Sequence, residues 1–465
     1  MRKTILVFLP LSGVGHLLPT LEFAERLLDQ RHDISIKVLS LHLPCDTISI
    51  TSVMSAHPRL TFVMLPSPEQ PSSPIEELSI EKYICDAVAL HANNVRNALS
   101  EIKALATSEG ARVGGLVLDY FCSSMIDVAN QHSLPSYLFL TSSAGFLRFM
   151  QWLPAWDDHG GAFFSFSDQK YPIPGFRNAV PVNALPSPCF NNEGGYATFL
   201  SLARRFSDFK GILINTFSDL ESYALKDISG HGEALPVYPI GPLIYFKGHS
   251  TPEMDESKAL EAMLWLDEQP DSSVVFVCFG SCGAFPSSQV REIAEGIERS
   301  KHRFLWHLRA HKNETGKTAE ELLPVGFLER VEGRGIVCGW VKQVEILAHK
   351  AIGGFLSHCG WNSTLESVWH AVPQTTLPIF AEQRLTAFET VREVGIAVEL
   401  KIEDAAEMCF ATAEEVERAV VNLMGEDCEA RRRVKQMSMA ARSAVEEGGS
   451  SHSSLSRFGN DFCRF

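Results

Sequence analysis

The sequence lacks long apolar runs. None of its 465 residues lies in a stretch near the roughly 18 uninterrupted apolar residues that would span a bilayer. The apolar segment at residues 4–11 follows Arg2 and Lys3, as a secretory signal would. Glycine, histidine and proline interrupt the pattern almost at once, however, and no small-residue cleavage site follows, so we interpret it as a buried strand. We therefore expect a soluble protein with no transmembrane segment.

Basic residues are few relative to acidic ones. The chain has 41 lysines and arginines against 56 aspartates and glutamates, which gives a formal net charge of −15. A protein that binds the phosphate backbone needs a concentrated basic face. We therefore expect no nucleic-acid partner.

Patterns for disulfides and metals are also missing. The eleven cysteines are scattered without a C-x-x-C pair, and the chain has no D-x-D run. The lack of a C-x-x-C pair argues against a disulfide framework and against a zinc site. The lack of a D-x-D run leaves no acidic motif suited to a divalent cation. We predict a cytoplasmic protein without a metal site.

Short apolar runs alternate with longer helical patterns through both halves of the chain. This alternation is typical of an α/β protein whose parallel sheets are covered by helices. We predict strands at residues 5–9, 34–39, 60–65, 114–118, 137–140 and 212–215, and then at 274–279, 304–308, 336–337, 354–356, 375–377 and 397–400. Helices are predicted at residues 21–30, 80–105, 288–299, 364–370, 413–424 and 428–447.

A turn-rich segment at residues 242–255 separates the two halves and has the composition of a linker. We predict two doubly wound domains, at residues 1–243 and 244–447, with a cleft between them. Ligands of such sheets bind beyond the carboxyl ends of the strands. The loops that follow the strands are therefore the places to seek chemistry.

The first such loop contains Gly13, Gly15 and His16, directly after the first strand. One interpretation is a dinucleotide site with Asp33 as the ribose carboxylate, although Leu18 stands where the third glycine belongs. Another makes His16 a general base that Asp119, at the end of a later strand, holds in one tautomer. A third is purely structural, with His16 packing the helix start and Asp119 capping a helix. The residues alone leave these alternatives open.

The second loop follows the predicted strand near residues 353–357. Residues 358–362 read His-Cys-Gly-Trp-Asn, and a helix is expected from Ser363 onward. Backbone N–H groups, the helix dipole and an imidazole together suit an anionic phosphate group. The structural alternative is a capping box from Ser363 to Glu366, with Trp340 as a core residue.

From Trp340 to Gln383 the chain resembles the signature segment of plant family-1 UDP-sugar-dependent glycosyltransferases. The elements W-x-x-Q, H-C-G-W-N-S, E-S and E-Q are all present, and the early G-x-G-H-L and the strand ending in Asp119 also have counterparts there. The resemblance implies the GT-B fold, with two facing Rossmann-like domains. It places the nucleotide sugar in the C-terminal domain and the acceptor in the N-terminal one, and packs a final helix, at about residues 448–465, back on the N-terminal domain.

The resemblance also implies roles for individual residues. His16 would remove the acceptor proton and Asp119 would orient it. The implied donor contacts are Trp340 on uracil, Gln343 and Glu366 on ribose, His358, Asn362, Ser363 and Ser281 on the diphosphate, and Trp361, Glu382 and Gln383 on the sugar, with Gly15, Val341 and Gly360 beside them. Five positions depart from the usual pattern: Val341 replaces an alanine, Lys342 a proline, Ala371 a glycine, Leu377 a tryptophan and Glu382 an aspartate.

The implied reaction is inverting transfer of glucose from UDP-glucose, a substrate rather than a bound cofactor, to give a β-glucoside. Fifteen aromatic residues fall between positions 139 and 209, and those on irregular segments would line an acceptor pocket. A flavonoid or another phenol is the preferred acceptor, with a terpenoid, a hormone or another UDP-sugar as alternatives. An NAD(P)-dependent oxidoreductase, a UDP-sugar epimerase or hydrolase, and a lectin-like carrier are the rival functions. We predict a monomer whose partners are small molecules.

Overall fold

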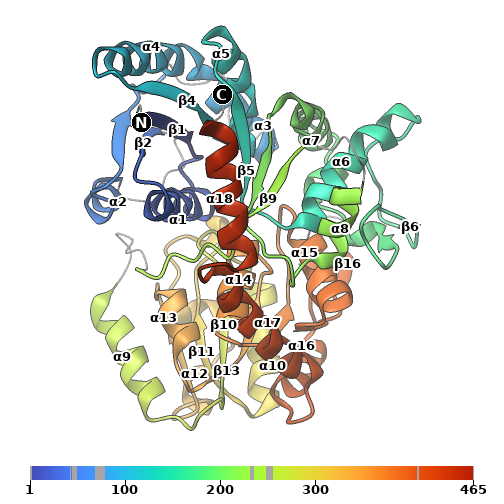
Figure 1. The fold of residues 1–465 in the computed structure, drawn as a ribbon. Helices are drawn as coiled ribbons and strands as arrows, with labels where there is room; N and C mark the ends of the chain where they lie inside the picture. The colour runs from blue at the N-terminus through green and yellow to red at the C-terminus, as the bar shows by residue number, and fades with distance from the viewer. Residues whose placement is uncertain are drawn as a thin grey trace.

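The computed structural model describes residues 3–41, 43, 50–68, 79–230, 235–247, 255–405 and 408–463. Two domains, each built on one parallel sheet with helices on both faces, lie one above the other (Figure 1). The predicted linker at residues 242–255 falls partly outside the described residues, at 248–254, and the boundary at residue 243 stays a prediction.

The first domain contains a seven-stranded sheet in the order β3-β2-β1-β4-β5-β8-β9, with all neighbours parallel. All six residues of β1 are buried. The strand order reverses between β1 and β4, so the loops that follow these two strands meet at the usual ligand position of such sheets. The strands are β1 (Thr4–Leu9), β2 (Ile34–Ser40), β3 (Thr61–Met64), β4 (Arg112–Asp119), β5 (Ser136–Leu140), β8 (Ile212–Ile214) and β9 (Val237–Pro239).

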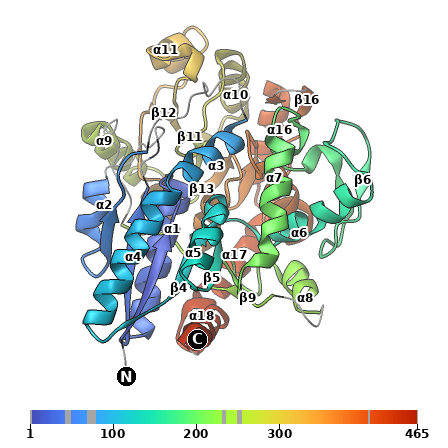
Figure 2. The same ribbon diagram turned by 90° about the horizontal axis from the view of Figure 1, so that it is seen from above.

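Helices cover both faces of this sheet, as the view from above shows (Figure 2). They are α1 (Val14–Gln30), α2 (Ile50–Ala56), α3 (Ile80–Leu90), α4 (Ala92–Ser108), α5 (Ile126–Gln131), α6 (Ala144–Asp158), α7 (Gly195–Arg204) and α8 (Ser222–Gly230). Short 3-10 turns occupy Tyr120–Met125 (η2), Val182–Ala184 (η3), Ser187–Phe190 (η4) and Arg205–Asp208 (η5), and a small antiparallel pair joins β6 (Lys170–Tyr171) to β7 (Val180–Pro181).

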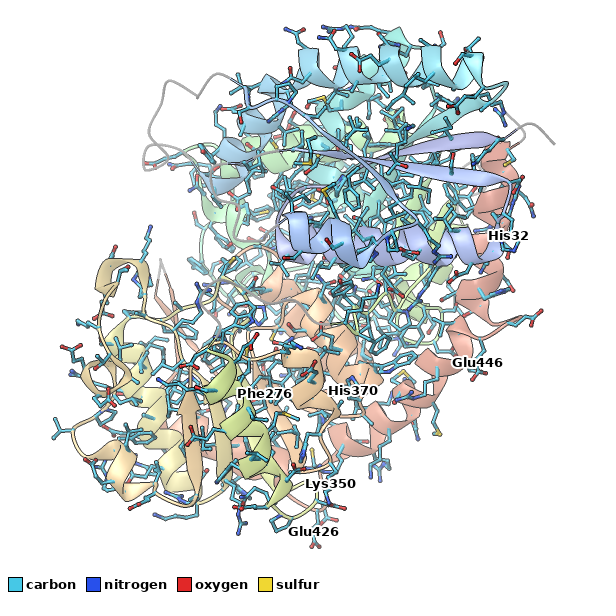
Figure 3. All side chains as sticks on the ribbon, turned by 90° about the vertical axis from the view of Figure 1, so that its left-hand side faces the viewer. His32, Phe276, Lys350, His370, Glu426 and Glu446 are labelled. Carbon is cyan, nitrogen blue, oxygen red and sulfur yellow. The ribbon has the colours of Figure 1, made fainter. Side chains whose placement is uncertain are left out.

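The second domain repeats the plan with the sheet order β12-β11-β10-β13-β14-β15. Its switch point lies between β10 and β13, and Phe276 of β10, labelled in Figure 3, is fully buried. The strands are β10 (Val274–Cys278), β11 (Arg303–His307), β12 (Gly335–Cys338), β13 (Ile352–Ser357), β14 (Gln374–Thr376) and β15 (Ala397–Val398), with an antiparallel pair β16 (Glu403–Ala405) and β17 (Met408–Phe410).

The helices of this domain are α9 (Glu256–Asp267), α10 (Ser287–Ser300), α11 (Ala319–Leu322), α12 (Phe327–Arg330), α13 (Gln343–Ala348), α14 (Trp361–Trp369), α15 (Gln383–Phe388), α16 (Ala413–Met424) and α17 (Glu429–Val445). A 3-10 turn spans Lys312–Glu314 (η6), and a π-helix, η7 (Glu389–Val394), directly continues α15.

The last helix, α18 (Ser450–Cys463), leaves the second domain and packs on the first (Figure 1). Phe458 is fully buried against Tyr137 and Tyr238. The hydroxyl of Tyr238 donates to Asp461 at 2.9 Å, and Figure 2 shows α18 beside β9. The chain therefore passes between the domains twice.

Strands occupy all twelve predicted positions, with ends displaced by a few residues. The helix predictions need three corrections. The first helix begins at Val14 rather than at residue 21, because Pro19 is tolerated inside it. The predicted helix at 80–105 is two helices that meet at His91, and α14 begins at Trp361 rather than at Ser363. Within the described residues, none of the helices has the length and apolar character needed to cross a bilayer.

Candidate active site between the domains

The carboxyl ends of β1 and β4 bring His16 and Asp119 together. His16 lies in the first turn of α1, and its Nδ1 is 2.7 Å from Oδ2 of Asp119, the last residue of β4. The other carboxylate oxygen accepts the backbone N–H of Phe121 at 3.0 Å and so caps the turn that follows. Asp119 thus performs both the orienting and the capping roles that the sequence left as alternatives.

The surroundings of His16 favour its protonated form. Burial lowers the pKa of this imidazole, but the charge and hydrogen bond of Asp119 and the charge of Glu382 raise it, and the net pKa lies above the usual 6.5. The Asp119 side chain is fully buried, whereas the His16 side chain is 24% exposed. Because Nδ1 faces Asp119, Nε2 is the ring nitrogen available to an incoming group.

The dinucleotide interpretation of the first loop is wrong in the role it gives Asp33, that of the carboxylate that binds the ribose. Asp33 precedes β2 and pairs with Arg31 at 2.8 Å, and its backbone carbonyl accepts the N–H of Thr4. It therefore lies at the amino edge of the sheet, whereas Gly13 and Gly15 lie at the carboxyl edge. Asp33 cannot contact a ribose bound at the glycine turn.

In the second domain His358 follows β13 and fits between two glycines. A Cβ atom on either Gly280 or Gly360 would come within 2.5 Å of its Nε2, and Gly280 has the left-handed φ of +75°. Burial lowers the pKa of His358 to about 4, so the imidazole is neutral near pH 7. Its Nδ1 is buried without a partner among the described residues. The ring and the free N–H groups at the start of α14 together form a donor-rich recess suited to an anion.

The capping box predicted at Ser363 does not form, because the helix already begins at Trp361. Instead the amide of Gln343 donates to Ser363 Oγ at 2.8 Å and to Glu366 Oε2 at 2.7 Å. Burial raises the pKa of Glu366 to about 7. Trp340 is half-buried after β12, edge-on to His307 with ring centroids 5.5 Å apart.

The start of α14 also contacts the first domain. The Asn362 amide donates to the carbonyl oxygen of Gly15 at 2.7 Å, and the Trp361 indole donates to the carbonyl oxygen of Asn215 at 2.7 Å. Pro19 has no N–H, so the Gly15 carbonyl lacks its usual helical partner four residues on and is left for Asn362. Trp361 is buried in this contact.

Glu382 and Gln383 differ in what they contact. Glu382 Oε1 accepts the Ser142 hydroxyl of the first domain at 3.1 Å. Gln383 Oε1 accepts the backbone N–H groups of Ile379 and Phe380, at 2.9 and 3.1 Å, and so shapes the loop before it. The structure thus places His16 and Glu382 on the two sides of one interdomain junction.

Two of the expected donor-site residues, Val341 and Ser281, have no side-chain hydrogen bond to the first domain among those described. Val341 is buried, and Ser281 lies in the turn after β10, where Arg309 donates to its carbonyl oxygen. Sequence reasoning missed Arg309, and it missed Thr141, whose Oγ1 is 3.2 Å from His16 Nδ1. Thr141 follows β5, so the rule that placed Asp119 at a strand end could have found it. The described part of the chain contains no cluster of three histidine, cysteine, aspartate or glutamate residues arranged for a metal ion.

The aromatic residues between 139 and 209 mainly pack against one another. Eight of the fifteen are buried, and Trp152, Trp156, Phe164 and Tyr171 form one cluster with centroid separations of 5.1–6.3 Å. The expectation that aromatics on the irregular segment line a pocket is therefore wrong for Phe164 and Tyr171. These side chains fasten the segment to α6.

Comparison with known proteins fits this geometry. Residues 235–434 match the family model described as UDP-glucoronosyl and UDP-glucosyl transferase. The chain is 43% identical to UDP-glycosyltransferase 71K1 of Malus domestica over 99% of both proteins. It is 41% identical to flavonol 3-O-glucosyltransferase UGT71C4 of Arabidopsis thaliana, over 98% of this chain and 97% of that protein.

Solved structures of UDP-glycosyltransferases have the same fold as this chain. Medicago truncatula UGT71G1 complexed with UDP-glucose superposes with a TM-score of 0.90 at 42% identity, over 99% of this chain and 98% of that one. Phytolacca americana UGT2, complexed with UDP-2-fluoro-glucose and pterostilbene, gives 0.86 at 30% identity over 99% and 100%. The expected fold and family are confirmed: the chain belongs to the plant family-1 UDP-dependent glycosyltransferases and is a UDP-glycosyltransferase of the GT-B fold.

Proposed function

We propose that this enzyme transfers glucose from UDP-glucose to a hydroxyl group of a flavonoid or another small phenol, with inversion at the sugar carbon. The observation that carries the proposal is the pairing of His16 with Asp119 at 2.7 Å, next to the junction where Asn362 and Glu382 of the other domain arrive. A relative named as a flavonol 3-O-glucosyltransferase supports the acceptor class.

In this mechanism His16 Nε2 removes the proton of the acceptor hydroxyl. Asp119 holds the opposite nitrogen and stabilises the imidazolium that forms. The acceptor oxygen then attacks the anomeric carbon from the side opposite the departing UDP. A single displacement of this kind converts the α-linked donor into a β-glucoside.

The leaving diphosphate would be held by the recess around His358, with Asn362, Ser363 and Ser281. Neutral His358 donates a hydrogen bond, and the N-terminus of α14 supplies a partial positive charge. We propose that these groups suffice without a divalent cation. Removal of metals with EDTA should then leave kcat within about twofold, and rescue of an EDTA-inactivated enzyme by Mg²⁺ or Mn²⁺ would contradict this part.

The remainder of the donor would lie along the ends of β12 and β14. Trp340 stacks on uracil, while Gln343 and Glu366, already linked at 2.7 Å, bind the ribose hydroxyls. The sugar hydroxyls face Glu382, Gln383 and the backbone of Trp361. Gly15, Val341 and Gly360 would form part of the wall of this donor-binding site.

The test is a UDP-release screen. UDP-glucose, UDP-galactose and UDP-glucuronate are each paired with phenolic and terpenoid acceptors, and the product anomer is read by NMR. We expect UDP-glucose with a phenol to be fastest and to give the β-anomer, and His16→Ala to be slower by about 10²-fold or more. Release of UDP at the same rate without any acceptor would contradict transfer, and an α-glucoside would contradict inversion.

A further inference from the structure

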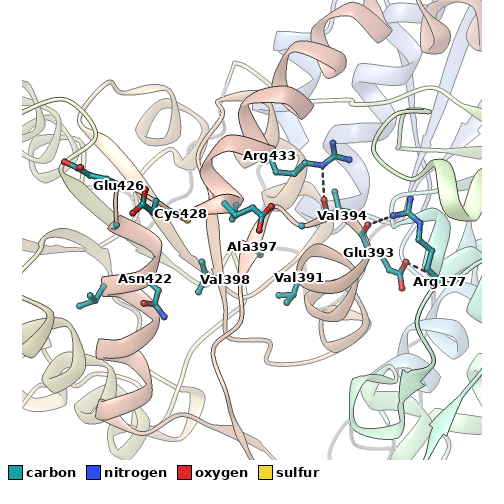
Figure 4. A pocket seen from close by; sticks show the side chains of 16 residues that line it. Arg177, Val391, Glu393, Val394, Ala397, Val398, Asn422, Glu426, Cys428 and Arg433 are labelled. Atoms are coloured by element: carbon teal, nitrogen blue, oxygen red, sulfur yellow. Dashed lines mark hydrogen bonds between the residues drawn. The ribbon is translucent and has the colours of Figure 1, made fainter.

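The helix that begins at Gln383 contacts the first domain at several points, beginning with Glu382, one of the residues proposed to contact the sugar. Glu382, just before α15, accepts the Ser142 hydroxyl at 3.1 Å. Further along, Glu389 and Glu393 of η7 also reach the first domain, and Figure 4 shows Arg177 of that domain beside Glu393. Glu393 Oε1 accepts the backbone and side-chain N–H groups of Asn178, each at 3.0 Å.

Glu389 is the most enclosed of these three carboxyl groups, with 1% of the residue exposed. Its Oε2 accepts the Ser143 hydroxyl at 2.8 Å, and its Oε1 lies 2.9 Å from the Tyr223 hydroxyl oxygen. A Cβ on Gly145 would collide with Oε1, so the first domain leaves space for this side chain. Glu389 opens a π-helix, a local widening that is frequent at functional sites.

A second buried carboxyl group, from the first domain, meets the same helix start. Glu221 is fully buried and accepts the backbone N–H groups of Ala144 and Gly145 at 2.9 and 3.0 Å. Ser143 is the N-cap of α6. The N-terminus of α6 is therefore held by one carboxyl group of its own domain and by one of the other.

Three consecutive residues before α6 each contact a different part of the junction. Thr141 is 3.2 Å from His16, Ser142 donates to Glu382, and Ser143 donates to Glu389. We propose that Glu389 is a positioning residue for sugar transfer, which acts through Ser143 and Tyr223 to hold residues 141–143 between His16 and Glu382. This inference rests on the proposed function and deepens it.

The charge state of the pair follows from its surroundings. Glu221, Glu393 and Tyr223 face Glu389, and Arg177 lies over the Tyr223 ring at 5.5 Å. Burial first, and the charge of Glu221 second, raise the pKa of Glu389 well above its usual range, while burial raises the pKa of Glu221 to about 7. The two N–H groups at the start of α6 favour ionised Glu221. Glu389 is therefore the neutral partner.

In the native enzyme Glu389 ionises only as the pH rises through its own raised pKa. The stability linked to a raised pKa is fully present below the pKa of the unfolded chain and is lost as the pH rises from there through the folded value. Ionisation of Glu389 would place a second negative charge beside Glu221. The contact should therefore weaken on the alkaline side, opposite to the acid side on which protonation of His16 stops transfer.

The experiment compares Glu389→Gln, which mimics the neutral acid, with Glu389→Ala, and uses Glu399→Gln as a control for loss of a surface carboxylate. Glu399 pairs with Arg392 at 2.6 Å and is 47% exposed. We expect Glu389→Ala to lower kcat at least tenfold with the Kd of UDP changed less than threefold. Glu389→Gln should stay within threefold of the wild type at pH 7 and retain activity at alkaline pH where the wild type declines.

A Glu389→Ala enzyme with wild-type kcat would overturn the inference, as would a Glu389→Gln enzyme as impaired as the alanine variant. If Glu389→Ala does not fold, Tyr223→Phe decides: a lowered kcat supports the inference and an unchanged kcat overturns it. A wild-type enzyme that transfers no sugar would instead refute the proposed function.

Discussion

The Asn362 amide donates to the carbonyl oxygen of Gly15 at 2.7 Å, and the two residues belong to different domains. Pro19 makes this bond available, because a residue with an N–H at position 19 would compete for the same carbonyl. A proline inside a helix, normally unfavourable, here exposes an acceptor at the junction of the two domains.

Replacement of this proline should separate stability from activity. Pro19→Ala restores a helical N–H and improves helix propensity by up to about 3 kcal/mol, so we expect an equal or higher Tm. The new bond competes with Asn362, so kcat/KM for UDP-glucose should fall several-fold. Pro154→Ala is the matched control, since Pro154 lies ten residues, or about 15 Å, along α6 from its start. A lower kcat/KM in both variants would contradict the explanation.

The His16–Asp119 pair predicts unequal losses in binding and catalysis. His16→Ala and Asp119→Asn should each lower kcat by about 10²–10⁴, the usual contribution of a positioned base. The Kd of UDP, measured by calorimetry, should change less than about threefold, because neither residue belongs to the recess around His358. A large loss of UDP affinity with kcat preserved would assign the pair to donor binding.

The pH dependence of kcat/KM follows from the raised pKa of His16. A base must be unprotonated, so activity should decline as the pH falls through a value above 6.5. Asp119→Asn removes the negative charge that raises this pKa, and its residual activity should decline only at lower pH. Profiles recorded with one acceptor in both enzymes provide the comparison. An acid limb at the same pH in both would contradict the role of Asp119.

The glycine beside His358 offers a test of the phosphate recess. Gly280→Ala introduces a Cβ within 2.5 Å of His358 Nε2, in a residue with φ of +75°. Gly333→Ala is the control, because its φ of +72° imposes the same backbone strain and nothing lies within 4 Å of the new Cβ. The backbone strain should cost both variants about 1 kcal/mol of stability, to which Gly280→Ala adds the clash with the His358 ring. Only Gly280→Ala should weaken UDP binding, by tenfold or more, and equal affinities would contradict the placement of the diphosphate.

Much of this architecture could be predicted from the sequence pattern, because buried parallel strands are continuous apolar runs. The loops that follow such strands all lie at the carboxyl edge of the sheet. That rule brings His16 and Asp119 together across 103 residues. The start of α1 was missed because proline usually marks a boundary. The capping box offered at Ser363 does not form, because its residue pattern also fits inside a helix that begins two residues earlier, at Trp361. Contacts between domains, such as Glu389 with Ser143, leave no local signal, because the partners are 246 residues apart and neither has a distinctive neighbourhood.

The return of α18 to the first domain bears on how the halves can move. The domains are joined by two covalent connections, one between β9 and α9 and one between α17 and α18. Two connections restrict the relative movement of the domains more than one would, and we therefore expect His16 of the first domain and Glu382 of the second to keep one relative position.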